Sequence, residues 1–363
     1  MKIVIDARES GTSTGRYVDK LIENLAKLKP EFEIAILTKS DRVSQLKLWA
    51  PSFEIIESNF KEFTFAEQIG FLRQVKSQKA DLVHFTATQQ PVLYGGKVIT
   101  TIHDLTTARF RNPAKNQIMF SAKQTVYKWV IKRVARKSLT VITPSQFTKN
   151  DVAQYAKIPP EKIHVTYEAA DKIAEAPKSV ADLSPGSFIM YVGRPLPHKN
   201  LERLIDAFAI LKQKQPQLQL VLAGKKDILF ERLEQKTRQN SIEGVVFTDF
   251  VSEGQLRWLY ENTAAYAFPS LSEGFGLPAL EAMAHGAPVV SSNATCLPEI
   301  YGDAVLYFDP QNPTEIAQKI KQVLDDKNLA QELRKKGLAQ AQKYTWQKTA
   351  EETLAVYRQV LRG

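Results

Sequence analysis

The chain has 363 residues, of which 44% are hydrophobic and 24% charged, a composition typical of a globular protein with room for two domains. No apolar stretch approaches the roughly 20 residues that cross a membrane, and Met1 leads directly into the strand-like KIVID rather than into a signal peptide. We therefore expect a cytoplasmic protein. Its one cysteine, Cys296, excludes an internal disulfide and a cysteine metal cluster.

Positive charge is concentrated in the first half of the chain. The formal net charge is +10; residues 1–150 carry 24 Lys and Arg against 13 Asp and Glu, whereas residues 151–363 carry 25 against 26. This asymmetry favours an anionic partner for the first half, such as a phospholipid surface or a phosphate-bearing acceptor. A generic solvated surface would carry the same excess, so both interpretations stay open.

The first half predicts alternating strands and helices. Lys2–Asp6 is a strand, residues 10–15 (SGTSTG) form a small-residue loop, and an amphipathic helix begins near Arg16. Phosphate groups commonly bind where such a loop ends at a helix N-terminus, although the glycines here are not the full dinucleotide fingerprint. Further apolar strand candidates are Ile34–Leu37, Phe53–Ile56, Leu82–Phe85, Val98–Ile102, Leu139–Ile142 and Ile163–Thr166. The alternation predicts a Rossmann-like domain with a parallel sheet.

His103 follows directly after the predicted strand Val98–Ile102. Ligands of open parallel sheets bind beyond the carboxyl ends of the strands, so this position makes His103 a candidate site residue. A structural histidine would fit the same position.

Residues 118–139 predict a long helix that mixes aromatic and apolar residues with lysines and arginines. One interpretation is a helix that lies on an anionic membrane, with its basic residues on headgroups and Trp129 at the interface. The alternative is a helix that packs on the core and has a solvated basic face.

A segment without periodicity, residues 174–187, contains two prolines and a glycine and is predicted to be a linker. After it the alternation of strands and helices resumes, which predicts a second Rossmann-like domain. We expect an N-terminal domain over 1–173, a C-terminal domain over 174–345, and a helix over 346–363 that packs back on the first domain.

The stretch from Ser270 to Glu299 has the features of a polar ligand site. A short apolar strand ends at Pro269, Gly274 and Gly276 allow close backbone approaches, and Pro278 suits the first turn of a helix. The free amides at that helix start favour an anionic or hydroxyl-rich ligand. An ordinary strand-to-helix turn would have the same spacing.

Arg194 and Lys199 stand just beyond the first strand of the second domain. A planar guanidinium and a mobile ammonium together suit a pyrophosphate, and they would stabilise a departing nucleoside diphosphate. The sequence contains no HExxH, no Cys/His cluster and no Asp-x-Asp pair, so we expect no bound metal and no cofactor.

The run EGFGLPALE from Glu273 to Glu281 resembles the signature of retaining glycosyltransferases of family 4, which have the GT-B fold of two Rossmann-like domains facing each other across a cleft. Further matching motifs occur in the right order along the chain: IDAR (5–8), GTSTGRYV (11–18), HDL (103–105), TPSQFTKND (143–151), YVGRPLPHKNLERLIDAF (191–208) and FVSEGQL (250–256). The opening motifs are most similar to the mannosyltransferases that build bacterial surface polysaccharides.

This resemblance implies a role for each matching residue. Arg194 and Lys199 would bind the donor diphosphate, and Glu281 would accept hydrogen bonds from the ribose hydroxyls. Glu273 would hold the transferred sugar together with the backbone amides of Gly274, Phe275, Gly276 and Leu277.

The remaining matches complete the expected site. Gly193 would lie beside the diphosphate, and Phe250 with Val251 would contact the base. Gly15 would approach the diphosphate from the first domain, and His103 would face the reacting sugar. With Glu273, Arg194 and Lys199, His103 forms the expected catalytic set.

Two segments depart from the family pattern. Residues 167–171 (YEAAD) replace the usual Asn-Gly-Val-Asp, and residues 10–15 are longer and more polar than the usual glycine pair. The second departure weakens the assignment of Gly15.

We predict a metal-independent enzyme that transfers a hexose, namely mannose from GDP-mannose, to a lipid-linked or polysaccharide acceptor with retention of the anomeric configuration. Its partners would be the nucleotide sugar, the acceptor and an anionic membrane at the inner face. The alternatives are a UDP-sugar transferase, an epimerase or phosphorylase of the same fold, and a non-catalytic nucleotide-sugar sensor. Nucleic acid would fit the charge alone, but the sequence has no recognised nucleic-acid module.

Overall fold

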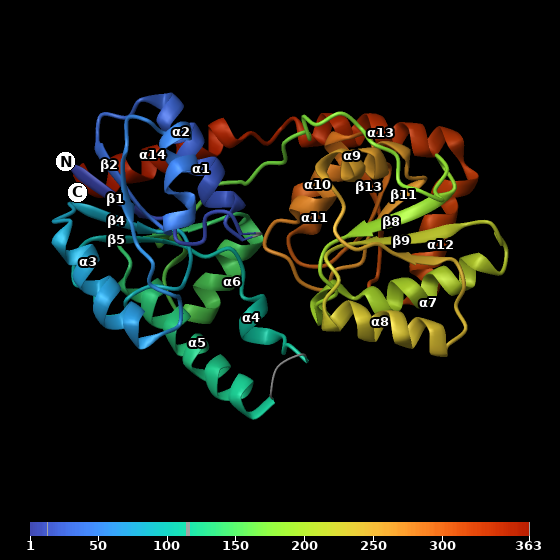
Figure 1. Ribbon diagram of the computed structural model, residues 1–363, viewed down its shortest axis with the longest axis horizontal. Helices are drawn as coiled ribbons and strands as arrows, with labels where there is room; N and C mark the ends of the chain where they lie inside the picture. The colour runs from blue at the N-terminus through green and yellow to red at the C-terminus, as the bar shows by residue number, and fades with distance from the viewer. Residues whose placement is uncertain (13, 114–116, 363) are drawn as a thin grey trace. The chain divides into compact units, whose positions relative to one another are not determined.

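The computed structural model describes residues 1–12, 14–113 and 117–362, and the side chains of 117–119 are outside the description (Figure 1). The chain forms two compact units. The first comprises residues 1–108, 122–168 and 345–363, and the second comprises residues 109–121 and 169–344. Each unit is built around one parallel sheet.

The first sheet has seven strands in the order β3-β2-β1-β4-β5-β6-β7. Its centre is the strand pair β1 and β4, where Val4 aligns with Val83 and is fully buried. Helices on both faces bury the strands, which is why they read as continuous apolar runs. The strands are β1 (Lys2–Asp6), β2 (Glu33–Thr38), β3 (Glu54–Glu57), β4 (Leu82–Phe85), β5 (Val98–Thr101), β6 (Thr140–Thr143) and β7 (Ile163–Val165).

The helices that accompany the first sheet differ in length, and some of the segments between its strands contain only a single helical turn. They are α1 (Arg16–Leu28), α2 (Val43–Trp49), α3 (Leu72–Ser77), α4 (Thr106–Arg109), α5 (Gln117–Lys137), α6 (Gln146–Ala156) and α14 (Trp346–Arg362), with 3-10 turns at Ser40–Arg42 and Pro160–Lys162 and a π-helical turn at Glu67–Phe71.

The second sheet has six strands in the order β10-β9-β8-β11-β12-β13, all parallel. The order reverses between β8 and β11, and loops after these two central strands are where a parallel sheet binds ligands. The strands are β8 (Phe188–Val192), β9 (Gln219–Ala223), β10 (Val245–Phe247), β11 (Ala265–Phe268), β12 (Val289–Ser292) and β13 (Val305–Phe308).

The helices of the second unit are of ordinary length and cover this sheet. They are α7 (Leu201–Lys212), α8 (Ile228–Gln239), α9 (Glu253–Asn262), α10 (Leu277–Ala284), α11 (Leu297–Tyr301), α12 (Pro313–Asp325) and α13 (Lys327–Ala341), with a 3-10 turn at Pro197–Lys199. The prediction of two Rossmann-like parallel-sheet units is confirmed.

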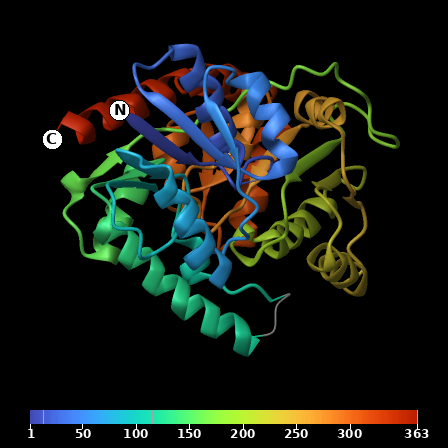
Figure 2. The same ribbon diagram turned by 60° about the vertical axis from the view of Figure 1, so that its left-hand side comes forward.

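The C-terminal helix α14 packs on the first unit, as the sequence predicts. Figure 2 shows that the two ends of the chain lie close together on this unit. Tyr357 of α14 is fully buried and its hydroxyl lies 2.6 Å from His84 Nδ1 on β4. The Thr349 hydroxyl donates to the carbonyl of Tyr167 at 2.5 Å. Buried polar contacts therefore fix the helix in place, in addition to its apolar face.

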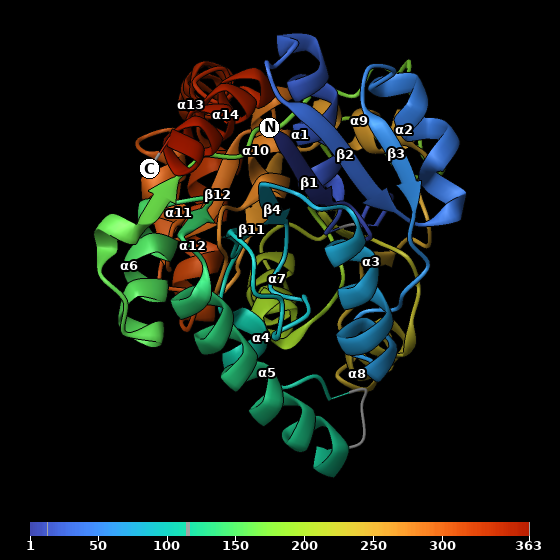
Figure 3. The same ribbon diagram turned by 90° about the vertical axis from the view of Figure 1, so that its left-hand side faces the viewer.

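Helix α5 extends away from the first sheet (Figure 3). Its C-terminal half buries Ile131, Val134 and Ala135, whereas Trp129 is 55% exposed. Trp129 therefore lies on the outer face of α5 and not on its packing face. Within the described ranges, no helix is both long and apolar enough to cross a membrane.

Candidate active site

The loop between β11 and α10 carries the Glu273–Glu281 motif. Gly276 caps α10 with φ +94°, and a Cβ placed there would lie 2.2 Å from the hydroxyl oxygen of Tyr301. The Tyr301 hydroxyl donates to the Gly276 carbonyl at 2.6 Å. Pro278 stands in the first helical turn, where no N–H is needed. The sequence thus requires a glycine for both conformation and space.

Glu281 lies within α10 and is 9% exposed. Its Oε2 accepts a hydrogen bond of 3.3 Å from the Tyr260 hydroxyl on α9. The Tyr260 ring stacks on His285, whose Nδ1–H donates to the Glu281 carbonyl while Nε2 accepts from the N–H of Ile173. Burial lowers the pKa of His285 to about 4, so the ring is neutral and its tautomer is fixed by these two bonds.

Lys199 and Glu273, 74 residues apart in the sequence, form a direct ion pair. Lys199 Nζ lies 2.6 Å from Glu273 Oε1, and both side chains are largely buried. The N–H of Leu271 donates to the His198 carbonyl at 2.7 Å, which joins the loop after β8 to the loop after β11. Asn200 strengthens this junction at φ +61°, and its amide donates to the Pro269 and Pro310 carbonyls. The structure therefore brings these two predicted residues together.

Arg194 contacts a different carboxylate. Its Nη2 and Nε lie 2.6 and 3.1 Å from Asp227 Oδ2, and Arg194 is the more exposed partner. Asp227 caps α8 by accepting from the N–H groups of Leu229 and Phe230. Partial burial raises the pKa of Asp227, but the Arg194 guanidinium and these two amides lower it by more. The net shift of the pKa is downward, so the carboxyl stays ionised. A phosphate at Arg194 must compete with this pair.

The predicted base contact lies on an exposed loop after β10. The Phe250 side chain is 78% exposed, which suits a residue that stacks on a ligand. Asp249 Oδ1 accepts from the N–H groups of Phe250 and Lys226 at 2.8 and 2.9 Å, which ties the loops after β9 and β10 together. Val251 follows Phe250 directly, and the Gly193 N–H donates to the carbonyl of Ala223 in β9.

Gly15 belongs to the first unit, where it precedes α1. Its φ of −77° is ordinary, but a Cβ there would lie 1.8 Å from the Glu9 carbonyl oxygen. The glycine is therefore needed for the close approach of Gly15 to the Glu9 carbonyl, whatever ligand binds nearby.

His103 lies beyond β5 on the wall of a cavity of about 160 Å³ in the first unit. Its Nδ1 is 2.8 Å from Glu168 Oε1 and its Nε2 is 3.1 Å from the Thr86 carbonyl oxygen. The Tyr17 ring meets the imidazole edge-on at 4.8 Å. These contacts hold the ring in one orientation, with 30% of the side chain exposed.

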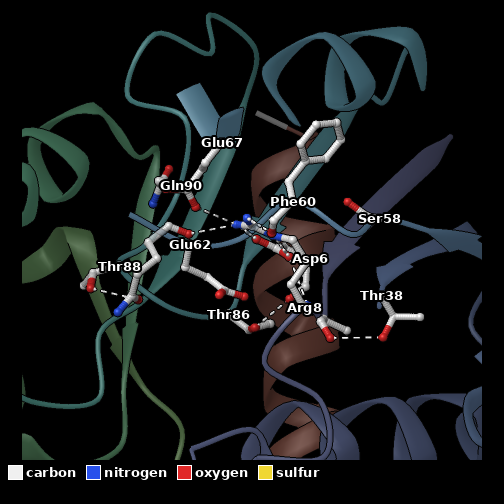
Figure 4. Close-up of polar contacts among 12 residues, drawn as sticks. Asp6, Arg8, Thr38, Ser58, Phe60, Glu62, Glu67, Thr86, Thr88 and Gln90 are labelled. Carbon is white, nitrogen blue, oxygen red and sulfur yellow. Dashed lines mark hydrogen bonds and ion pairs between the residues drawn. The ribbon is translucent and has the colours of Figure 1, made fainter. Parts of the chain in front are cut away.

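Arg8 of the IDAR motif is a buried ion-pair centre, not an exposed site residue. It is 2% exposed, and its Nη2 lies 2.8 Å from Asp6 Oδ2 and 2.9 Å from Glu67 Oε1 (Figure 4). The guanidinium also donates to the Phe60 carbonyl and packs over the Phe71 ring at 3.6 Å. Burial raises the pKa of Glu67 despite the ion pair with Arg8. The motif therefore anchors the connection between β3 and α3 to the end of β1.

Several residues in these contacts were not predicted as site residues. Asp227 and Glu168 are single acids in ordinary sequence surroundings, and their partners lie 33 and 65 residues away. Glu168 lies in the YEAAD segment that departs from the family pattern, but no site role was predicted from that departure. In the described ranges, no group of three or more His, Cys, Asp or Glu residues could hold a metal ion.

Two family descriptions match the chain and together cover most of it. "Glycosyl transferases group 1" matches residues 153–340, and "Glycosyltransferase Family 4" matches residues 14–172.

The names of curated relatives agree with these family matches. The chain is 30% identical to O-antigen chain mannosyltransferase B of Escherichia coli over 72% of its own length and 70% of the relative. It is 29% identical to the serotype-specific mannosyltransferase WbdA of Escherichia coli, and spans about a third (34%) of that protein.

Solved structures share the fold at lower identity. Sucrose-phosphate synthase from Thermosynechococcus elongatus matches with a TM-score of 0.79 and 21% identity, over 100% of this chain and 99% of that one. HepE of Anabaena, solved with UDP and glucose, matches with a TM-score of 0.73 and 19% identity over 99% of both chains. The chain therefore belongs to the group 1 glycosyltransferases, family 4, and has their GT-B fold.

Proposed function

We propose that this protein transfers mannose from GDP-mannose to a lipid-linked or polysaccharide acceptor, with retention of the anomeric configuration. The observation that carries the proposal is the 30% identity over 278 residues to a protein named as an O-antigen chain mannosyltransferase. A relative from Mycolicibacterium hassiacum, 28% identical over 76% of the chain, is named as an alpha-(1->4)-mannosyltransferase, which supports mannose as the sugar.

The contacts of the second unit support a nucleotide sugar as the donor. A diphosphate can displace Asp227 from Arg194 and Glu273 from Lys199, because both pairs join a cation to a carboxylate that a phosphate oxygen can replace. Glu273 would then be released to accept hydrogen bonds from the sugar hydroxyls. Glu281 is held by Tyr260 at the other end of the motif and would accept from the ribose.

We propose front-face transfer. The bond from the anomeric carbon to the phosphate oxygen breaks, the bond to the acceptor oxygen forms on the same face, and the acceptor proton passes to the departing phosphate. Arg194 and Lys199 would stabilise the charge that develops on the leaving diphosphate, which is the task a divalent metal performs elsewhere. We therefore propose that the reaction needs no metal.

Peripheral contact with an anionic membrane is part of the proposal. The outer face of α5 presents Lys128, Arg133 and Arg136 beside the exposed apolar residues Val126 and Trp129. Basic side chains interact with anionic headgroups, and an exposed tryptophan inserts at the interface. A lipid-linked acceptor would then be presented in the plane of this surface, at the inner face of the membrane.

A panel of nucleotides and nucleotide sugars tests the donor. Thermal unfolding is measured with GDP, GDP-mannose, UDP and UDP-glucose, since a ligand of the native state raises the melting temperature. We expect GDP-mannose to stabilise the protein most and to be turned over equally well with or without EDTA. Stronger stabilisation by UDP-glucose would identify a UDP-sugar transferase instead, and loss of turnover in EDTA would contradict metal independence.

Vesicle binding tests the membrane contact. Binding to vesicles that contain 30% phosphatidylglycerol should fall as salt rises, and Lys128→Glu with Arg133→Glu should weaken it further. The same charge change at exposed Lys327 and Lys335 in the second unit is the matched control. Binding that ignores both salt and anionic lipid would remove this part of the proposal.

A further inference from the structure

Two histidines of the first unit, His84 on β4 and His103 just beyond the neighbouring strand β5, have different kinds of partners. His84 on β4 is fully buried, with Nδ1 at 2.6 Å from the Tyr357 hydroxyl and Nε2 at 2.8 Å from the Thr101 hydroxyl. A hydroxyl can donate or accept, so one can donate to the ring and the other can accept from it. A neutral imidazole satisfies both contacts, and burial lowers the pKa of His84 to about 3.

His103 faces acceptors on both sides. The Glu168 carboxylate at 2.8 Å and the Thr86 carbonyl at 3.1 Å can only accept hydrogen bonds, so both ring nitrogens must carry a proton to bond with them. The ring that satisfies both contacts is the imidazolium. Burial lowers the pKa of His103, but the hydrogen bond and charge of Glu168 outweigh it, and the net shift is upward.

The other ionisable groups around His103 leave Glu168 as its main counter-charge. Glu168 is itself buried, follows β7, and contacts the ring directly. The Tyr17 phenol on α1 stays neutral, because burial raises its pKa to about 12. The remaining neighbours are Asp104 beside the ring, His84 on β4, and Glu9 and Tyr127, which line the same cavity.

We propose that Glu168 is a positioning residue that holds His103 as a fixed imidazolium on the wall of this cavity, so that His103 contributes positive charge and does not accept a proton. The Nε2–H, whose partner is a backbone carbonyl, can also donate to a ligand hydroxyl or phosphate oxygen that approaches it, without a change of protonation. The inference rests on the proposed function and sharpens its mechanism. A protonated His103 does not act as the base for the acceptor, which agrees with the proposed passage of the acceptor proton to the departing phosphate oxygen.

Glu168 lies in the YEAAD segment that replaces the Asn-Gly-Val-Asp of the family pattern. Counted back from the shared final aspartate, Asp171, Glu168 stands where the pattern has asparagine, which has no carboxylate to set the charge of a histidine in this way.

Histidine NMR tests the charge state without any assay of activity. The protein has five histidines, and the ring carbon signals of a 13C-histidine sample are assigned by single His→Gln changes. We expect His103 to titrate above the ordinary value near 6.5, and Glu168→Gln to lower its midpoint by about one unit or more. Glu168→Asp keeps the charge and should restore part of the shift. His84, which should stay neutral throughout, reports in the same spectra that the sheet is intact.

The pH dependence of turnover tests the role. Activity that needs the imidazolium persists below the raised pKa of His103 and falls as pH rises through it, so Glu168→Gln should move this alkaline fall of kcat/KM to lower pH by the shift seen in NMR. Glu161→Gln, an exposed acid on the turn before β7, is the matched control and should leave the profile in place.

The outcomes separate the two proposals. The inference is overturned if the titration midpoint of His103 is unchanged in Glu168→Gln. It is also overturned if the pH profile of kcat/KM becomes lower in this variant but does not shift along the pH axis. A protein that prefers another donor while His103 still titrates high and follows Glu168 contradicts the proposed function and leaves the charge state of His103 as inferred.

Discussion

Removal of the buried guanidinium of Arg8 should destabilise the first unit severely. In Arg8→Met the side chain keeps much of its length, so the Phe71 contact is retained while both ion pairs are lost. Asp6 and Glu67, with 7% and 3% of their side chains exposed, then stay buried without a cation. Breaking a buried ion pair in this way costs about 3–5 kcal/mol.

The assay is guanidinium chloride unfolding followed by tryptophan fluorescence in a Trp258→Phe background, which leaves Trp49, Trp129 and Trp346, all in the first unit. The loss in free energy of unfolding should shrink as pH falls below about 5, because Glu67, whose pKa is raised by burial, then becomes protonated and no longer leaves a buried charge without a cation.

Arg358→Met is the matched control, because Arg358 makes two 2.7 Å contacts with Glu31 at an exposed position. It should change stability little. A loss below about 1 kcal/mol in Arg8→Met, or a loss that does not depend on pH, would refute the reasoning from burial.

Three further predictions concern the second unit. Glu281→Ala should weaken GDP binding about 10- to 100-fold in calorimetry, the loss expected for a charged hydrogen-bond acceptor, while Glu351→Ala at an exposed position of α14 should not; equal affinities would reject the ribose role. Asp227→Asn keeps an N-cap for α8 and frees Arg194, so GDP affinity should rise, by up to about fivefold for an exposed pair; a fall would mean that Asp227 assists the ligand. Gly276→Ala should lower the free energy of unfolding by at least about 1 kcal/mol more than Gly286→Ala. Both glycines have positive φ, but of the two only a Cβ at Gly276 would meet another atom within 4 Å; similar losses would mean that backbone strain alone matters.

Local patterns account for the parts of the fold that the sequence predicts. Buried apolar runs such as Lys2–Asp6 and Phe188–Val192 predict strands of a parallel sheet, because such strands are covered on both faces. The order of the strands depends on crossovers that no local pattern encodes. The docking of α14 could be expected from its apolar residues, whereas the hydroxyl of Tyr357 on His84 required the structure.

The candidate site also has a part that local sequence patterns predict and a part that required the structure. Glu273 and Glu281 are marked by glycines and a proline at fixed spacing, and these local signals can be read from sequence. The partners that set charge lie far away in the chain: Asp227 for Arg194, and Glu168 for His103. A single acid on a loop or helix start has many ordinary explanations, so sequence reasoning found Arg194 and His103 but not the carboxylates of Asp227 and Glu168 that contact them.

The linkage formed by the enzyme tests the central claim most directly. The protein is incubated with 13C-labelled GDP-mannose and a mannose-terminated, lipid-linked glycan in vesicles, and the one-bond carbon–hydrogen coupling of the new anomeric centre is measured by NMR. The account predicts an α-mannosidic product, the configuration of the donor, formed faster than any product from UDP-glucose. A β-linked product, or faster transfer from UDP-glucose, would contradict it.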